Sequence, residues 1–294
     1  KTRRVEPAVP PLSDPADSPQ YAGKAADNRL LAIRELMRME MPDRWSDLLG
    51  TSVENIRPNA SDTVFNALKH NQPSSNPPFL IEPTALWSTY IRRYRSLRTN
   101  DPEIIRSNQG AECLYMVITL ATADGEARSL FGDSAIGDTD NDGAPEFLDG
   151  WGNPIQFLRW APGYESDLQL SSVALSDPNL TLEDVERMIA TDHDPFDIYR
   201  RDDRMSGNRM INGYEHLNDQ ISAFRLVPLI FSAGPDEDPD IHVALIHVRP
   251  GNTWVDPYQQ TSFGAFLGSP SAAPLDDDGE NWHDNITNHL LVGE

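Results

Sequence analysis

The residues best able to do chemistry are the acidic side chains of one segment, Asp138-Thr-Asp-Asn-Asp-Gly-Ala-Pro-Glu-Phe-Leu-Asp149. Carboxylates stand at its first, third and fifth positions, a glycine at the sixth, and further acids at the ninth and twelfth. A loop with this spacing curls around a calcium ion and surrounds it with oxygen atoms. The sequence therefore predicts a calcium site whose ligands are the carbonyl of Ala144 and the side chains of Asp138, Asp140, Asp142, Glu146 and Asp149.

Two residues of this segment differ from a helix-loop-helix calcium site. Asp149 stands where such sites have a bidentate glutamate, and its shorter side chain reaches less far. Pro145 disfavours a helix directly after the loop. The alternative interpretation is an acidic turn that is stabilised by hydrogen bonds between its own backbone and its carboxylates.

Other groupings of acids and histidines are weaker candidates for catalysis. Asp192-His193-Asp194 and His283-Asp284 place imidazoles beside carboxylates, as a general base or a transition-metal site requires, but most such sequences are surface loops. Glu146 and Asp149 could form a glycosidase pair, but the predicted calcium loop already employs both. The chain has no nucleophile elbow, phosphate loop or dinucleotide fingerprint, and we predict that it is not an enzyme.

The charge of the chain limits its partners. It contains 24 basic and 46 acidic residues, which gives a formal net charge of -22 at pH 7. A chain this acidic repels phosphate backbones and attracts divalent cations, so nucleic acid is not expected as a partner. The single cysteine, Cys113, lies in an apolar run and is expected to be a buried hydrophobic residue. No stretch reaches the ~20 apolar residues of a membrane-spanning helix.

Apolar periodicity predicts helices in the first part of the chain and a small antiparallel sheet with long loops in the second, which is the α+β class. Residues 1–26 are expected to be a linker or flexible arm, residues 27–130 a helical region, and residues 131–294 a head with an insertion at about 161–224. The expected helices cover residues 27–41, 60–70, 83–97, 109–123 and 181–190, and the expected strands cover residues 155–160, 225–232 and 241–248.

Three short segments occur in the order found in a known protein family. They are Asp149-Gly-Trp-Gly-Asn-Pro-Ile-Gln-Phe157, Phe231-Ser-Ala-Gly-Pro-Asp-Glu-Asp-Pro-Asp-Ile241 and Asp284-Asn-Ile-Thr-Asn-His289. They resemble the Trp-Gly-Asn-Pro turn, the Ser-x-Gly-x-Asp loop and the terminal Asp-Asp-Ile-Gly-Asn-Trp segment of the major pseudopilin of type II secretion systems. The acidic loop before the turn is also similar to that of larger type IV prepilin-like proteins of planctomycete-type bacteria.

The resemblance implies a pilin-like head, whose small sheet packs on a long helix that anchors the subunit in the inner membrane before assembly. It implies a structural subunit of a pseudopilus or a type IV pilus-like filament, in the periplasm or at the cell surface, with copies of itself and other pilin-like subunits as partners. It also implies a second calcium loop, with Asp236, Asp240 and the carbonyl of Ser232 as ligands and with Asp284 closing the tail over the site.

The chain differs from that family in three respects. The hydrophobic first helix is missing, Glu237-Asp-Pro239 replaces a glycine-rich stretch, and an insertion follows the Trp-Gly-Asn-Pro strand. An alternative function is a secreted calcium-dependent adhesin or carbohydrate-binding module, which the aromatic residues Trp254 and Tyr258 in a Pro- and Gly-flanked loop would suit. A calcium-assisted hydrolase is a more distant alternative.

Overall fold

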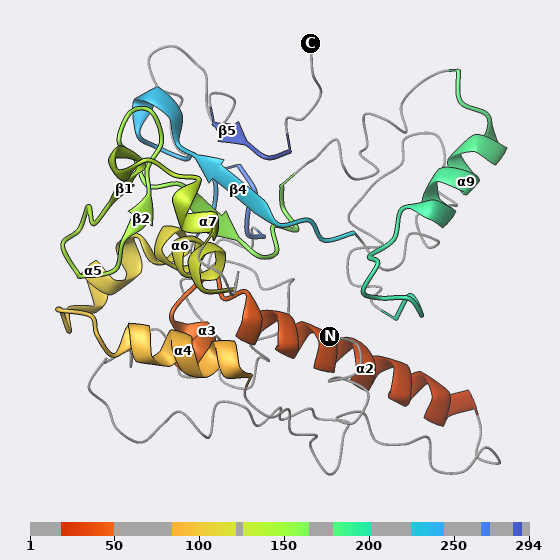
Figure 1. The fold of residues 1–294 in the computed structure, drawn as a ribbon. Helices are drawn as coiled ribbons and strands as arrows, with labels where there is room; N and C mark the ends of the chain where they lie inside the picture. Colours follow the sequence, from red (N-terminus) through yellow and green to blue (C-terminus); the bar gives the residue numbers. More distant parts are fainter. Residues whose placement is uncertain are drawn as a thin grey trace.

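The computed structural model describes residues 19–49, 84–121, 126–164, 179–201, 225–243, 266–270 and 285–289. Within these ranges helices come first and short antiparallel strands follow, so the predicted α+β class is confirmed (Figure 1). The elements are α2 (Pro19–Glu40), α3 (Ser46–Leu49), α4 (Ala85–Tyr94), α5 (Pro102–Ser107), α6 (Gln109–Ala121), α7 (Glu126–Ser129), the 3-10 helix η4 (Asp133–Ala135), β1 (Ile136–Gly137), β2 (Glu146–Phe147), β3 (Gln156–Leu158), α9 (Leu182–Thr191), β4 (Leu229–Ser232), the 3-10 helix η6 (Gly234–Asp236) and β5 (Ile286–Thr287).

The long helix α2 starts at Pro19 rather than at the predicted Asp27. Residues 19–26 are therefore helical instead of part of a linker. Proline suits the first turn of a helix, where its missing N–H costs no hydrogen bond, and the alanines that follow favour the helix. Helix α4 begins after Thr84, whose Oγ1 accepts a hydrogen bond of 3.1 Å from the N–H of Trp87. The helix predicted over residues 60–70 lies outside the described residues.

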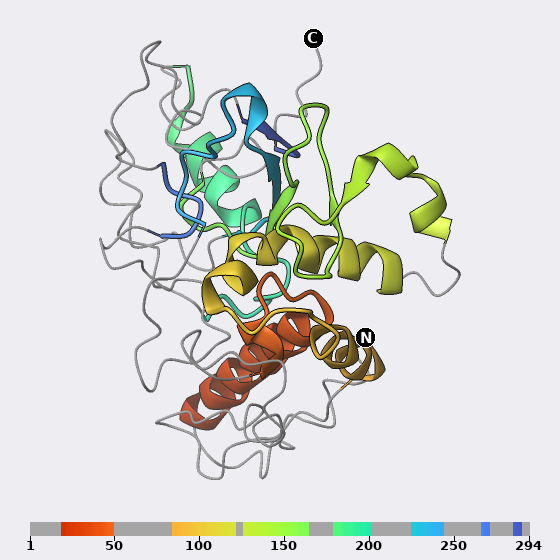
Figure 2. The ribbon, with the colours of Figure 1, turned by 90° about the vertical axis from the view of Figure 1, so that its left-hand side faces the viewer.

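Helix α6 lies between the helices of the first half and the strands of the second (Figures 1 and 2). One face packs against α2, α3 and α4 in a buried cluster that includes Cys113 and Met116. Another face contributes Leu114 to a second cluster, with Phe147 of β2 and Phe157 of β3. The helix predicted over residues 109–123 is present as α6 and is covered on two faces, and Cys113 is buried as expected.

The strands form two small antiparallel sheets. β1 and β2 pair as a hairpin, with Ile136 opposite Phe147, and the acidic segment forms the loop between them. β3, β4 and β5 form a three-stranded sheet in that order, in which Phe231 of β4 lies opposite Thr287 of β5. The terminal segment, for which the sequence predicted no strand, thus extends the sheet.

Two other predicted elements have different outcomes. The helix predicted over residues 181–190 is present as α9, and it begins with a capping box: Oγ1 of Thr181 accepts from the N–H of Asp184, and the Asp184 carboxylate accepts from the N–H of Thr181. The strand predicted over residues 241–248 is described only as far as residue 243, and there Ile241 makes an isolated bridge to Pro270. None of the described helices combines the length and the apolar character needed to cross a membrane.

Candidate metal centre

The acidic loop (residues 138–146) is the turn of the β1–β2 hairpin, and its backbone curls around its own carboxylates. The N–H of Gly143 lies 3.2 and 3.4 Å from the two carboxylate oxygens of Asp138, and the N–H of Ala144 donates to Oδ1 of Asp142 at 2.7 Å. Gly143 permits this curl, because its φ is +99° and a Cβ atom there would lie 3.0 Å from the side chain of Arg98. The hydrogen bonds expected of an acidic turn are therefore present.

Two overlapping groups of carboxylates lie at this loop. Asp138, Asp140 and Asp142 each bring one carboxylate oxygen within 4.8 Å of the others. Asp140 forms a second such group with Glu146 and with Glu112, which belongs to the first turn of α6. We call these five residues the carboxylate cluster. The chain thus contains acidic groups able to hold a metal ion where the sequence predicted them, with an additional member from a helix.

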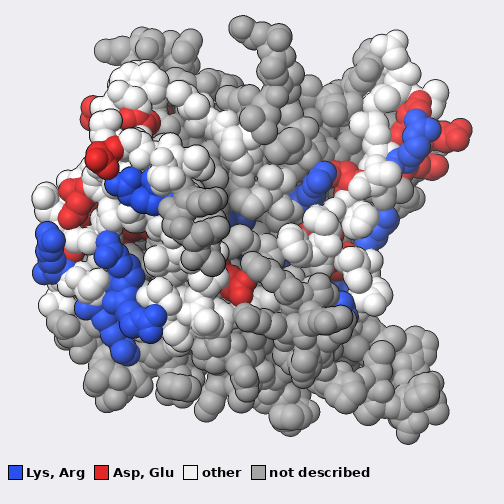
Figure 3. Space-filling view, viewed as in Figure 1, with Lys and Arg blue, Asp and Glu red and all other residues white. Residues whose placement is uncertain are grey.

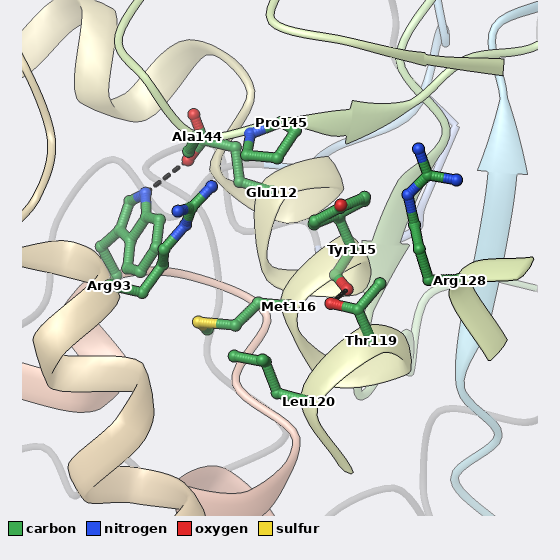
Figure 4. A pocket seen from close by; sticks show the side chains of 10 residues that line it. Arg93, Glu112, Tyr115, Met116, Thr119, Leu120, Arg128, Ala144 and Pro145 are labelled. Atoms are coloured by element: carbon green, nitrogen blue, oxygen red, sulfur yellow. Dashed lines mark hydrogen bonds between the residues drawn. The ribbon is translucent and has the colours of Figure 1, made fainter. Parts of the chain in front are cut away.

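Glu112 is the member that the sequence did not predict. It lies on the apolar helix α6, and 1% of its surface is exposed. Its Oε2 accepts a hydrogen bond from Nε1 of Trp45 (Figure 4). The signal that could have singled it out is a carboxylate within an apolar helix, because acids are rarely buried without a partner. No local pattern shows that its neighbours come from the hairpin.

The burial of the carboxylate cluster makes its ionised form unfavourable. Burial, together with the neighbouring acids, raises the pKa of Glu112 to about 10, that of Asp142 to about 6 and that of Glu146 to about 7. Like charges out of water favour a proton between them, or a cation that takes its place. Metal binding to such a cluster would release protons.

Side chains at the junction of α5 and α6 orient the carboxylates. Oγ of Ser107 donates to Oδ2 of Asp140 at 2.9 Å. Nδ2 of Asn108 donates to Oγ1 of Thr139 at 2.8 Å and lies 3.5 Å from Oε1 of Glu146. The N–H of Thr139 donates to Oε2 of Glu146 at 3.1 Å. Hydrogen bonds of this kind fix the direction of carboxylate oxygens, as the groups around metal ligands do.

Asp149, predicted as the ligand at the twelfth position, lies outside the carboxylate cluster. Its Oδ1 accepts hydrogen bonds of 2.8 Å from the N–H groups of Trp151 and Asn153, and its Oδ2 accepts the hydroxyl of Ser232. Burial alone would raise the pKa of Asp149, but these hydrogen bonds lower it. The chain leaves the loop as strand β2, whose extended backbone moves Asp149 away from the other acids. The structure does not group Asp149 with the other predicted ligands, and it shows the carboxylate holding the Trp-Gly-Asn-Pro turn instead.

The second predicted calcium loop, which follows β4, gathers no comparable group of acids among the described residues. Asp236 is exposed and accepts the N–H of Asp238 at 3.1 Å. Asp240 has a left-handed backbone with a φ of 48°, and burial with the neighbouring acids raises its pKa. Ser232 belongs to β4, and Asp284 lies outside the described residues. The described residues of this loop do not bring its predicted ligands together, and the second calcium site stays a prediction.

Three segments far apart in the sequence meet around this second loop. In addition to the contact of Asp149 described above, Nδ2 of Asn153 donates to the carbonyl of Gly234 at 2.9 Å. Nδ2 of Asn285 donates to the carbonyl of Pro239 at 2.6 Å. The segments are the Trp-Gly-Asn-Pro turn, the loop after β4 and the terminal segment. The tail is thus tied to the loop through Asn285.

A pocket of about 330 Å³ opens beside the carboxylate cluster, between α4, α6 and residues 144–145 (Figure 4). Glu112 and its hydrogen-bond partner Trp45 both line it, and Met116 and Leu120 of α6 contribute apolar side chains to its wall. Arg93 extends from α4 toward Glu112. The pocket therefore provides a path from solvent to the edge of the cluster.

The basic side chains at the end of α4 lie away from its buried face. Trp87, Tyr90 and Tyr94 of this helix are buried, whereas Arg92 and Arg95 are exposed. Basic side chains gather over this helix in the space-filling view (Figure 3). Arg92 and Arg95 thus form a solvated flank of the helix.

The acids beside His193 have basic partners of their own. Asp192 lies 3.9 Å from a guanidinium nitrogen of Arg225, and Asp194 lies 4.0 Å from one of Arg34. Among the described residues, His193 belongs to no group of three potential metal ligands.

Comparisons of the chain with models of known protein families, with curated proteins and with solved structures found no match.

Proposed function

We propose that this chain is the head of a structural subunit of a type II secretion pseudopilus or type IV pilus-like filament, and that calcium rigidifies the head. The observation that carries the proposal is the junction of the three segments that resemble the pseudopilin family. Their contacts through Asn153 and Asn285 join residues 81 and 46 positions apart in the sequence. The antiparallel sheet in the order β3-β4-β5 brings the same segments together.

Calcium is the ion that best suits the carboxylate cluster. The side chains of the carboxylate cluster offer only hard oxygen atoms as ligands. Calcium prefers such ligands, whereas Zn²⁺ and similar metals prefer nitrogen and sulfur. A flexible loop suits calcium better than Mg²⁺, because Mg²⁺ requires nearly octahedral geometry. In this proposal Asp138, Asp140 and Asp142 hold the ion from the loop, with Glu146 at the start of β2.

The work of such a subunit is mechanical. The head would present surfaces that pack against copies of itself and against other pilin-like subunits, in the periplasm or at the cell surface. A hydrophobic helix of the kind found in that family would anchor it in the inner membrane before assembly. Calcium bound only by the folded head would stabilise it, by an amount that grows with the ratio of free calcium to Kd.

The sequence encoded upstream of Lys1 and the location of the protein in its cells test whether it is a filament subunit. A subunit of this kind requires a short basic leader upstream of Lys1, followed by about twenty apolar residues with a glutamate at the fifth mature position. Antibodies to the head should label filaments in material sheared from the cells. An ordinary cleavable signal peptide, together with a monomer free in the medium, would contradict the proposal.

A secreted calcium-dependent adhesin or carbohydrate-binding module is the second candidate, and Trp151 favours it. Its side chain is 54% exposed in the Trp-Gly-Asn-Pro turn, and exposed tryptophan is typical of binding surfaces. Retention of the chain on immobilised polysaccharide that is lost in Trp151→Ala would support this function. Equal behaviour of both proteins would exclude Trp151 as the sugar contact.

A further inference from the structure

Glu112 and Asp142 present buried oxygen atoms that face no donor. Glu112 is 1% exposed and Asp142 is 0% exposed. Neither Oε1 of Glu112 nor Oδ2 of Asp142 has a hydrogen-bond donor among the described residues. The two carboxyl groups face each other, so they can share a hydrogen bond only when one of them is protonated. Buried oxygens without a partner are costly, and a proton or a cation can satisfy each of these two.

The surroundings favour a cation. Glu112 reaches Asp140 and Glu146 within 4.8 Å through one oxygen atom each, so its carboxylate belongs to a set of acids. Besides burial, the neighbouring charges that raise the pKa of Glu112 are those of Asp142, Asp140 and Glu146, all of them acidic. Arg93 lines the adjoining pocket but donates no hydrogen bond to the free oxygen of Glu112. One proton bridges two oxygens, whereas a calcium ion takes six to eight oxygen ligands and can satisfy several acids at once.

We propose that Glu112 is a ligand of a calcium ion, so that the site is shared between α6 and the β1–β2 hairpin instead of belonging to the acidic loop alone. This inference rests on the calcium binding proposed above and assigns to it a further ligand and a further role. The pocket beside Glu112 supplies the entry path that such a site needs.

A shared site has a different consequence from a loop site. An ion held by the acidic loop alone orders the backbone of that loop. An ion that also binds Glu112 fastens the hairpin to α6, which packs against the helices on one face and the strands on another. Calcium then stabilises the packing between the helical region and the head, and not only the loop.

Glu112→Gln tests this ligand while it keeps the shape of the side chain. Glutamine still offers an oxygen to Nε1 of Trp45 and also offers an N–H to Asp142, so the metal-free protein is expected to stay folded. The change removes the negative charge that would bind calcium. Glu186→Gln, at an exposed position of α9, is the matched control.

Calorimetric titration of the metal-free chain with calcium measures the effect. Loss of a group that merely supports a metal ligand weakens binding about 10–100-fold, so loss of the ligand should weaken it at least about tenfold. Glu186→Gln should bind as the wild type does. Equal affinity in the wild type and Glu112→Gln would overturn this inference and leave calcium binding intact. A wild-type chain that binds no calcium would overturn both.

Terbium luminescence provides a readout that does not depend on stability. Tb³⁺ replaces calcium in oxygen sites, and a nearby indole ring sensitises its emission. Trp45, which donates to Glu112, is placed for this transfer. Excitation of tryptophan should produce emission that calcium suppresses and that falls strongly in both Trp45→Phe and Glu112→Gln. Emission unchanged in both variants would locate the ion elsewhere and overturn the inference.

Discussion

Nη1 of Arg159 lies 2.6 Å from Oδ2 of Asp47, with both side chains buried. Arg159 follows β3 and Asp47 belongs to α3, so the pair joins the three-stranded sheet to the helices of the first part of the chain. The backbone N–H of Arg159 also donates to Oδ2 of Asp43 at 3.0 Å, and its guanidinium donates to the carbonyl of Met41 at 2.9 Å. Burial alone would raise the pKa of Asp43, but Arg159 and its other partners lower it. The sheet and the N-terminal helices therefore meet through buried charges, and the buried carboxylates of Asp43 and Asp47 need the positive charge of Arg159.

Replacement of Arg159 by methionine should therefore destabilise the whole structure. The change leaves the carboxylates of Asp43 and Asp47 buried with one cation fewer, and breaking a buried pair in this way costs about 3–5 kcal/mol. Urea unfolding measures the loss. Arg187→Met removes a pair with Asp184 whose arginine is 67% exposed, and should change the free energy of unfolding by less than about 0.5 kcal/mol. Similar small effects of both changes would show that the Arg159 pair is not a stabilising link.

Calcium should raise the melting temperature through the carboxylate cluster. At a free concentration a hundredfold above Kd, a bound ion stabilises the folded chain by about 2.7 kcal/mol. Asp140→Asn should abolish most of this effect, because Asp140 belongs to both carboxylate groups. Asp133→Asn, whose side chain is 98% exposed, should keep the full effect. Calorimetric scans with calcium and with excess chelator measure this rise of the melting temperature. An identical wild-type melting curve under both conditions would rule out the site.

The metal-free chain should lose stability as the pH rises from about 5 to about 8. Because the pKa is raised to about 6 in Asp142 and about 7 in Glu146, the folded state keeps protons that the unfolded chain releases near pH 4. This contribution is complete below about pH 4 and is lost as the pH passes 6 to 7. Melting temperatures in excess chelator measure it.

The variant Glu146→Gln is the control for this pH dependence of the melting temperature. Glu146→Gln cannot titrate, so it should show a weaker decline of melting temperature between about pH 5 and about pH 8 than the wild type. Calcium should stabilise the wild type more at the higher pH, where fewer protons compete for the carboxylates. The same decline in both proteins would mean that Glu146 does not titrate in this range.

Ser232→Ala should weaken the junction of the three segments. The hydroxyl of Ser232 donates to the Asp149 carboxylate and accepts the N–H of Gly234 at 3.2 Å. A hydrogen bond to a charged group contributes about 1.5–3 kcal/mol, which urea unfolding can measure. Ser96→Ala removes an exposed hydroxyl that donates to the carbonyl of Arg93 at 2.6 Å, and should cost less than about 0.5 kcal/mol. Equal costs would argue against a special role for the Ser232 contact.

The sequence by itself determined the features that depend on near neighbours. The capping box of α9 joins residues three positions apart, and the acidic loop curls through hydrogen bonds that span two to five positions. The apolar run around Cys113 was sufficient to predict that this residue is buried, because a helix without a polar face must be covered on several sides.

Only the tertiary structure decided which distant groups meet. Glu112 joins the acids of the hairpin because α6 packs under β2, and Asp149 binds Ser232, 83 positions away, because β3 and β4 pair. The spacing of the acidic segment included Asp149 and omitted Glu112, since a pattern along the chain registers separation in sequence and not the direction in which a strand leaves a loop. The calcium loop predicted from spacing thus became a carboxylate cluster shared with a helix, and that sharing depends on packing which no local pattern contains.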